Sequence, residues 1–206
     1  MSLTPDRRRV LALGLALPAA LALPRGAWAA ERPTGDIPMG DPDAPVTVIE
    51  YASFTCPHCA TFHTETWPQV KENYVDTGKV RFILREVYFD PYGLWAAMVA
   101  RCGGEGPYRA IVSQLMKQQD SWTAAEDRAG ALQRIGRANG LSSDEIRACL
   151  QDRDYAEALV ERYKETAGAD EVTSTPTFLI NGEVQTGTMP YEEFAAILDK
   201  HLAEAS

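Results

Sequence analysis

The sequence predicts an α/β fold in which an all-helical segment interrupts the sheet-forming part. Two runs with strand character, residues 46–51 and 80–87, flank a stretch of helical spacing, which indicates a βαβ unit with parallel strands. Only helical patterns occur in residues 91–167. Two further strand-like runs, residues 177–180 and 184–186, precede a last helical pattern. We therefore expect a βαβ half, a helical insertion and a ββα half, in that order.

Residues 1–29 have the layout of a secretory signal peptide. Three arginines at positions 7–9 precede an apolar stretch over residues 10–23, and residues 27–29 (Ala-Trp-Ala) fit a small-x-small cleavage site. The apolar stretch is short for a membrane span and contains Pro18. An uncleaved anchor stays an alternative, and the adjacent arginines allow a twin-arginine as well as a Sec route. We expect an exported protein, in a compartment where disulfides persist.

The chain that remains is large enough for one domain with its own core. About 177 residues follow the predicted cleavage site, which is within the usual size of a single domain. The whole chain has a net charge of -9, and loss of the arginine-rich leader makes this about -12. Such an acidic protein is a poor partner for nucleic acid or for an anionic membrane surface.

The first half of the α/β part is expected over residues 46–90, after an irregular lead-in. Residues 30–45 are rich in Pro, Gly and Asp, which predicts a tether without regular structure. A helix should begin at about Pro57, and Pro68 should kink or break it. Its core-facing residues, recognised by helical spacing, are Phe62, Trp67, Val70 and Tyr74.

The helical insertion is expected over residues 91–167 and the second α/β half over residues 168–206. In the second half, Asn181-Gly182 predicts a two-residue hairpin between the late strands, and Pro190 opens the last helix. Ser142 or Ser143 before two acidic residues predicts a helix N-cap. The helical patterns of the insertion cover residues 94–102, 108–118, 124–138, 143–150 and 155–166.

Cys56-Pro57-His58-Cys59 carries the most specific functional signal. Two cysteines in this spacing at a strand-to-helix turn predict a redox dithiol. The helix N-terminus favours a thiolate at Cys56, Pro57 suits the first helical turn, and His58 adds a titratable positive charge. We expect Cys56 to be an exposed nucleophile of low pKa and Cys59 to be the more buried resolving thiol.

Other interpretations of the motif are weaker. A c-type haem site needs His directly after the second cysteine, and Ala60 stands there. A structural zinc site needs about four ligands, and His63 is the one further candidate nearby. A purely structural Cys56–Cys59 disulfide would close too small a loop to stabilise much. We expect no metal and no cofactor, and an exposed or packing role for His63.

The order of elements with the dithiol at the first helix resembles the DsbA family of bacterial disulfide oxidoreductases. The resemblance covers essentially the whole mature chain. Its most specific pieces are the dithiol with Phe54 ahead of it, Glu50 six residues before Cys56, and Ser174-Thr175-Pro176 before a late strand. It implies a thioredoxin-like fold with an inserted α-helical subdomain, located in the periplasm.

The resemblance also implies roles for Glu50 and for the late loop. Glu50 matches an acidic residue that relays the proton of Cys59, and burial would suit it as a general base; an exposed side chain at a strand edge is the alternative. Thr175-Pro176, after Ser174, matches a cis-proline loop whose backbone pairs with an extended substrate peptide. The best-known oxidases of the family often carry Val where this chain has Thr175.

Cys102 and Cys149 need a separate explanation. In an oxidising compartment they are expected to form a structural disulfide within the helical part, and some proteins similar to DsbA carry a second disulfide there. Two buried free thiols are the alternative, because helix geometry can hold two cysteines too far apart to bridge.

The expected function is that of a monomeric, exported thiol:disulfide oxidoreductase. It would donate the Cys56–Cys59 disulfide to reduced secreted proteins through a mixed disulfide at Cys56. The family resemblance implies reoxidation by a membrane quinone-linked partner resembling DsbB. The alternatives are a disulfide isomerase or reductase, a peptide-binding chaperone with an incidental dithiol, and a metallochaperone that holds copper(I) on soft sulfur ligands.

Overall fold

The computed structural model describes residues 32–205. The predicted signal peptide and its cleavage site lie outside these residues. Within them, no helix is both long enough and apolar enough to cross a membrane.

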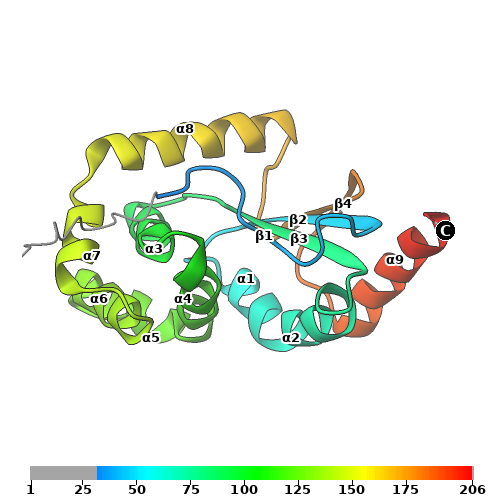
Figure 1. The fold of residues 1–206 in the computed structure, drawn as a ribbon, viewed down its shortest axis with the longest axis horizontal. Helices are drawn as coiled ribbons and strands as arrows, with labels where there is room; N and C mark the ends of the chain where they lie inside the picture. The colour runs from blue at the N-terminus through cyan, green and yellow to red at the C-terminus, as the bar shows by residue number, and fades with distance from the viewer. Residues whose placement is uncertain (1–31, 206) are drawn as a thin grey trace, which may run out of the picture.

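A five-stranded sheet of order β1-β3-β2-β4-β5 lies at the centre of the α/β part (Figure 1). The central strand β2 (Val46–Ala52) runs parallel to β3 (Val80–Glu86) and antiparallel to β4 (Thr177–Ile180). The outer strands β1 (Pro38–Met39) and β5 (Glu183–Thr186) pair antiparallel with β3 and β4 respectively. The predicted parallel βαβ unit and the late antiparallel hairpin are confirmed.

The N-terminal lead-in is more regular than its composition predicts. Its β1 strand adds to the edge of β3, and Ile37 is only 1% exposed. Asp36 forms a 2.9 Å ion pair with Arg85 of β3, and Arg101 donates hydrogen bonds to two carbonyl groups of the segment. A two-residue strand is too short to show period-two alternation, so the pattern gave no sign of it.

The helix after β2 passes through Pro68 without breaking. Its first wide π turn ends at Thr66, and Pro68 then lies in the first turn of the next α-helical segment, where the missing N–H is tolerated. Of the kink or break expected at Pro68, the break is wrong, because the helix continues and widens locally before this residue. The four consecutive segments are α1 (Pro57–Thr61), η1 (Phe62–Thr66), α2 (Trp67–Val70) and η2 (Lys71–Val75).

Helices cover both faces of the sheet. One face carries α1, α2 and the C-terminal α9 (Tyr191–Glu204), and the other carries α8 (Arg153–Ala169) (Figure 1). The core beneath α1 and α9 is aromatic: the rings of Phe62, Phe178 and Phe194 lie with centroids 4.7 to 5.4 Å apart. A smaller apolar cluster lies beneath α8. This layering buries the even-numbered side of β2 against the helix that carries the dithiol.

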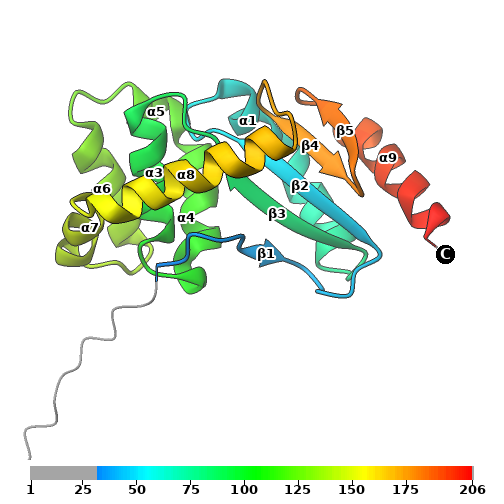
Figure 2. The same ribbon diagram turned by 90° about the horizontal axis from the view of Figure 1, so that it is seen from above.

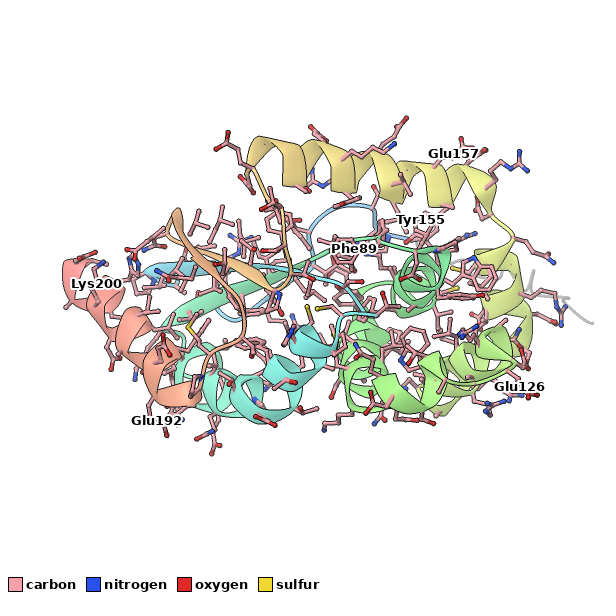
Figure 3. The ribbon with its side chains drawn as sticks, turned by 180° about the vertical axis from the view of Figure 1, so that it is seen from behind. Phe89, Glu126, Tyr155, Glu157, Glu192 and Lys200 are labelled. Carbon is pink, nitrogen blue, oxygen red and sulfur yellow. The ribbon has the colours of Figure 1, made fainter. Side chains whose placement is uncertain are left out.

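The helical insertion packs at one end of the sheet, and α8 leads from it back across the sheet (Figure 2). A short helix at residues 119–123, not expected from the sequence, precedes a helix that begins at Arg128 rather than at 124, because the Asp127 side chain caps it. Charged side chains such as Glu126, Glu157 and Glu192 point outward (Figure 3). The helices are α3 (Pro91–Arg101), α4 (Glu105–Lys117), α5 (Gln119–Thr123), α6 (Arg128–Ala138) and α7 (Ser143–Leu150).

Two local predictions are confirmed in the same region and at the late hairpin. Ser142 caps α7 and forms a capping box with Glu145. Asn181 and Gly182 both have left-handed backbone angles, with φ of 47° and 89°, as a two-residue hairpin turn requires.

Candidate active site

Cys56 is the N-cap of α1, at the junction between the central strand and its helix. Its backbone is extended (φ -87°, ψ 117°), and its N–H donates to the carbonyl of Ser53 at 3.1 Å. The Cys56 carbonyl accepts the N–H groups of Cys59 and Ala60 at 3.1 and 3.2 Å. The Cys56 side chain is partly exposed, whereas Cys59, one turn into the helix, is 0% exposed. One thiol is thus accessible and the other is enclosed.

The two thiols have opposite electrostatic environments. A hydrogen bond from the Cys59 thiol is the largest influence that lowers the pKa of Cys56 to about 5, against the opposing effect of burial. Hydrogen bonds from Thr175 and from the backbone N–H groups of Cys59 and His58 lower it further. The Cys56 sulfur, burial and the charge of Glu50 raise the pKa of Cys59. In the reduced site, Cys56 is therefore the thiolate and Cys59 the thiol.

Pro57 and His58 lie on the surface at the start of α1, and both side chains are exposed. Pro57 occupies the first helical turn, where its missing N–H costs no hydrogen bond. His58 acts on the Cys56 sulfur through its backbone N–H. The effect of the imidazole charge, expected from the sequence, stays a prediction.

The loop Ser174-Thr175-Pro176 lies beside the dithiol, although 119 residues separate Thr175 from Cys56. The Thr175–Pro176 peptide bond is cis. The Cys56 sulfur lies 3.5 Å from the Thr175 carbonyl oxygen, to which it donates a hydrogen bond when it is protonated. The hydroxyl of Thr177 donates to the Ser174 carbonyl at 2.8 Å and holds the loop at the start of β4. The fold thus brings together two motifs that the sequence shows far apart.

Glu50 and His63 are buried together beneath the dithiol. Glu50 lies on the central strand and is 0% exposed, so the strand-edge alternative is wrong. His63 is 4% exposed, and its Nε2 lies 2.8 Å from Oε2 of Glu50. Its ring also packs against Phe62 and Trp67. The sequence predicted an exposed or packing role for His63 and missed this polar contact.

The loop before Cys56 is held by residues that carry no motif. The buried Gln119 side chain donates to the carbonyl oxygens of Phe54 and Cys56 at 2.8 and 3.0 Å. The Thr55 hydroxyl donates to Asp90 at 2.6 Å. An Asp directly before a Pro is a helix N-cap signal, so Asp90 was detectable as a cap, which it is. For Gln119 the sequence offers no signal.

Cys102 and Cys149 meet at the packing of α3 against α7. Both thiols are buried and free in the structure, and each acts on the other: Cys149 lowers the pKa of Cys102, and Cys102 raises the pKa of Cys149. The Cys102 thiol also donates to the Glu145 carbonyl and the Cys149 thiol to the Met98 carbonyl, each at 3.3 Å. The two thiols therefore lie close to each other. The disulfide expected between them stays a prediction. In residues 32–205 no group of three or more His, Cys, Asp or Glu residues is placed to hold a metal ion.

Comparison with known proteins identifies the class to which this protein belongs. A family model described as thioredoxin matches residues 33–200. The chain is 33% identical to a Rickettsia bellii protein named as a protein-disulfide oxidoreductase, covering 82% of this chain and 66% of that protein. A Rickettsia felis protein of the same name is 34% identical, with coverage of 82% and 61%. The chain therefore spans just under two thirds of the length of these relatives.

A solved structure is similar over nearly its whole length. The crystal structure of α-DsbA1 from Wolbachia pipientis has a TM-score of 0.77 and 32% sequence identity, covering 83% of this chain and 92% of that chain. The sheet, the dithiol at the helix N-terminus and these matches define a thioredoxin-like fold with a helical insertion. The chain belongs to the DsbA family of protein-disulfide oxidoreductases.

Proposed function

We propose that this protein is an exported thiol:disulfide oxidoreductase that oxidises reduced secreted proteins. One observation carries the proposal: a partly exposed Cys56 whose pKa is lowered to about 5 lies at a helix N-terminus against a buried Cys59 thiol. A thiol of low pKa next to a shielded partner suits a site that exchanges disulfides with other proteins through one sulfur only.

The reaction runs through a mixed disulfide at Cys56. A substrate thiolate attacks the Cys56 sulfur, the Cys56–Cys59 bond breaks, and Cys59 leaves with the electron pair and takes up a proton. A second substrate thiolate then attacks the substrate sulfur of the mixed disulfide, and Cys56 leaves as a thiolate. The low pKa of Cys56 makes it a good leaving group in this second step. The substrate gains a disulfide and the protein gains a dithiol.

The stabilised thiolate also sets the direction of electron flow. Interactions that lower the pKa of Cys56 stabilise the reduced protein but not the disulfide form, so they make the disulfide a stronger oxidant. This supports an oxidase over a reductase. Thr175, in place of the Val that well-known oxidases carry, keeps a disulfide isomerase or reductase as the second candidate.

Two features beside the dithiol suit a reduced, partly unfolded polypeptide. The backbone of the loop at Thr175 lies against the Cys56 sulfur, where an extended peptide can pair with it as an added strand. Phe89 is 60% exposed and precedes Asp90, which accepts the hydroxyl hydrogen of Thr55 next to Cys56 (Figure 3). An exposed aromatic ring on the segment bonded to this loop offers apolar contact area to a substrate polypeptide.

The compartment and the reoxidising partner complete the proposal. Residues 1–29 would direct export to the periplasm, where substrates emerge with reduced thiols. A membrane quinone-linked partner resembling DsbB would return the dithiol to the disulfide. We expect the protein to act as a monomer.

Oxidation of a reduced peptide with two cysteines tests the function. The purified oxidised protein should convert it at least ten times faster than the C56S variant, and C59S should accumulate a mixed disulfide with the peptide at Cys56. Equal rates for wild type and C56S would contradict the proposal. Faster repair of a scrambled disulfide protein than oxidation of the peptide would favour the isomerase.

A further inference from the structure

His63 and Glu50 form a buried pair next to the resolving thiol. Nε2 of His63 lies 2.8 Å from Oε2 of Glu50, and neither residue is more than 4% exposed. Glu50 belongs to the central strand β2, whereas His63 belongs to η1 and follows Cys59 by four residues. Residues four apart lie one above the other on a helix, so the imidazole and the Cys59 thiol share the buried side of this helix.

The two oxygens of the Glu50 carboxyl group have different surroundings. His63 contacts Oε2, while Oε1 is buried without a hydrogen-bond partner in residues 32–205. A carboxylate oxygen is a hydrogen-bond and proton acceptor, and no other protein group of residues 32–205 occupies this one. The Cys59 thiol is the proton source near this oxygen, because the charge of Glu50 acts directly on this thiol.

We propose that His63 is a positioning residue that holds Glu50 ready to exchange a proton with Cys59, and that this proton reaches solvent through the imidazole. The inference deepens the proposed oxidase function and rests on it. An imidazole can both donate and accept a proton through its ring nitrogens. It is also the less enclosed member of the pair, since His63 is 4% exposed and Glu50 is 0% exposed.

The proton balance follows the two halves of the catalytic cycle. When substrate attack breaks the Cys56–Cys59 bond, Cys59 leaves with the electron pair and takes a proton from Glu50, which His63 reprotonates. During reoxidation, a disulfide-bearing partner forms a mixed disulfide with Cys56. Cys59 then gives its proton to Glu50, attacks the Cys56 sulfur and releases the partner as a thiolate. Electrons pass between sulfur atoms only.

Few groups face the Glu50–His63 pair, so its effect on the Cys59 thiol can be measured separately from other influences. In the described part of the chain, the polar contact of the His63 side chain is Glu50, and its ring neighbours are Phe62 and Trp67 at 5.5 and 6.0 Å between centroids. The groups acting on the Cys59 thiol are Cys56, Glu50 and the Ser53 backbone. A change at His63 should therefore reach Cys59 through Glu50.

Reoxidation by glutathione disulfide isolates the step in question. At high glutathione disulfide, reaction at Cys56 is fast and the observed rate reaches a plateau, which is the rate of Cys59 attack on the mixed disulfide. Acid quenching followed by mass spectrometry separates the mixed disulfide from the product. The variants are E50Q, H63Q and the double variant, measured from about pH 5 to 8. H201Q is the matched control, because His201 is a second buried histidine, 6% exposed, on α9.

The expected pattern is a non-additive cycle. At pH 7, E50Q and H63Q should each lower the plateau about tenfold, and the double variant should be no slower than E50Q. H201Q should match wild type. A wild-type plateau in H63Q at every pH would overturn the inference, as would an additional tenfold loss when H63Q is added to E50Q. Peptide oxidation by the wild-type protein tests the proposed function separately, so failure of one is distinguishable from failure of the other.

A second measurement needs no variant and so does not depend on folding of H63Q. The imidazole nitrogen NMR signals of wild-type protein are recorded in the oxidised and reduced forms. The signals of His63 should shift between the two forms while those of His201 stay in place. Unchanged His63 signals would overturn the inference.

Discussion

The side chain of Gln119, on the helical insertion, donates a 3.0 Å hydrogen bond to the carbonyl oxygen of Cys56, on the α/β core. The same amide donates to the Phe54 carbonyl at 2.8 Å. The insertion therefore does more than enlarge the protein, since it fixes the backbone on both sides of the residue that precedes the nucleophile.

Replacement of Gln119 by Ala should weaken the active-site loop. The buried Phe54 carbonyl would lose the Gln119 donor, while the Cys56 carbonyl would keep only the N–H donors of Cys59 and Ala60. We expect this loss to cost about 1–3 kcal/mol in free energy of unfolding. Urea unfolding of the reduced protein measures this loss. Q118A is the matched control, because Gln118 is the exposed neighbour and should change stability by less than about 0.5 kcal/mol. Equal stabilities of Q119A and Q118A would contradict the role of Gln119.

Removal of the Cys59 thiol should raise the pKa of Cys56 more than removal of the His58 side chain. The hydrogen bond from Cys59 is the largest influence that lowers this pKa, and His58 also contributes through a backbone N–H that substitution leaves in place. The thiolate absorbance of C59A and H58A, titrated against pH, measures both shifts. We expect an upward shift in each, with C59A the larger. A larger shift in H58A would mean that the imidazole charge dominates.

Stability of the reduced protein relative to the oxidised protein should fall with acid. The pKa of Cys56 is about 5 in the folded protein against an ordinary value of 9.0. Because folding lowers it, the stabilisation is complete above about pH 9, shrinks below that, and is lost at about pH 5. The pKa of Cys59 is raised, so Cys59 changes the stability of the reduced protein only when the pH exceeds the ordinary pKa of 9.0. Unfolding of both redox forms across this range checks the trend, and a pH-independent difference would contradict it.

Cys102 and Cys149 should be oxidised in protein isolated from the oxidising compartment. Each thiol shifts the pKa of the other, and the closed loop is long enough for a disulfide to stabilise by up to about 4 kcal/mol. A thiol assay on denatured, non-reduced protein with an oxidised Cys56–Cys59 pair should find no free thiol. Two free thiols would show that the second pair is not bridged.

Helix caps and turns could be predicted from the sequence, because the residues that form them act on their own neighbours in the chain. Cys56 stands at the N-cap position of its helix, Ser142 forms a capping box, and Asn181 and Gly182 turn the hairpin, because each depends on adjacent backbone groups. The α/β order with inserted helices followed from periodicity for the same reason.

Contacts between distant elements were not readable in this way. The Glu50–His63 pair depends on how η1 packs on β2, and the two wide turns of this helix, which change its register, have no sequence signature. Gln119 looks like any surface glutamine until the insertion folds onto the loop. The two-residue β1 strand is held by pairing and by ion pairs rather than by its own pattern.

The reduction potential of the Cys56–Cys59 pair, measured by equilibration with glutathione, tests the oxidase proposal most directly. A stabilised Cys56 thiolate predicts a potential well above that of thioredoxin, about -270 mV. A value near -270 mV would contradict the proposal and indicate a reductase.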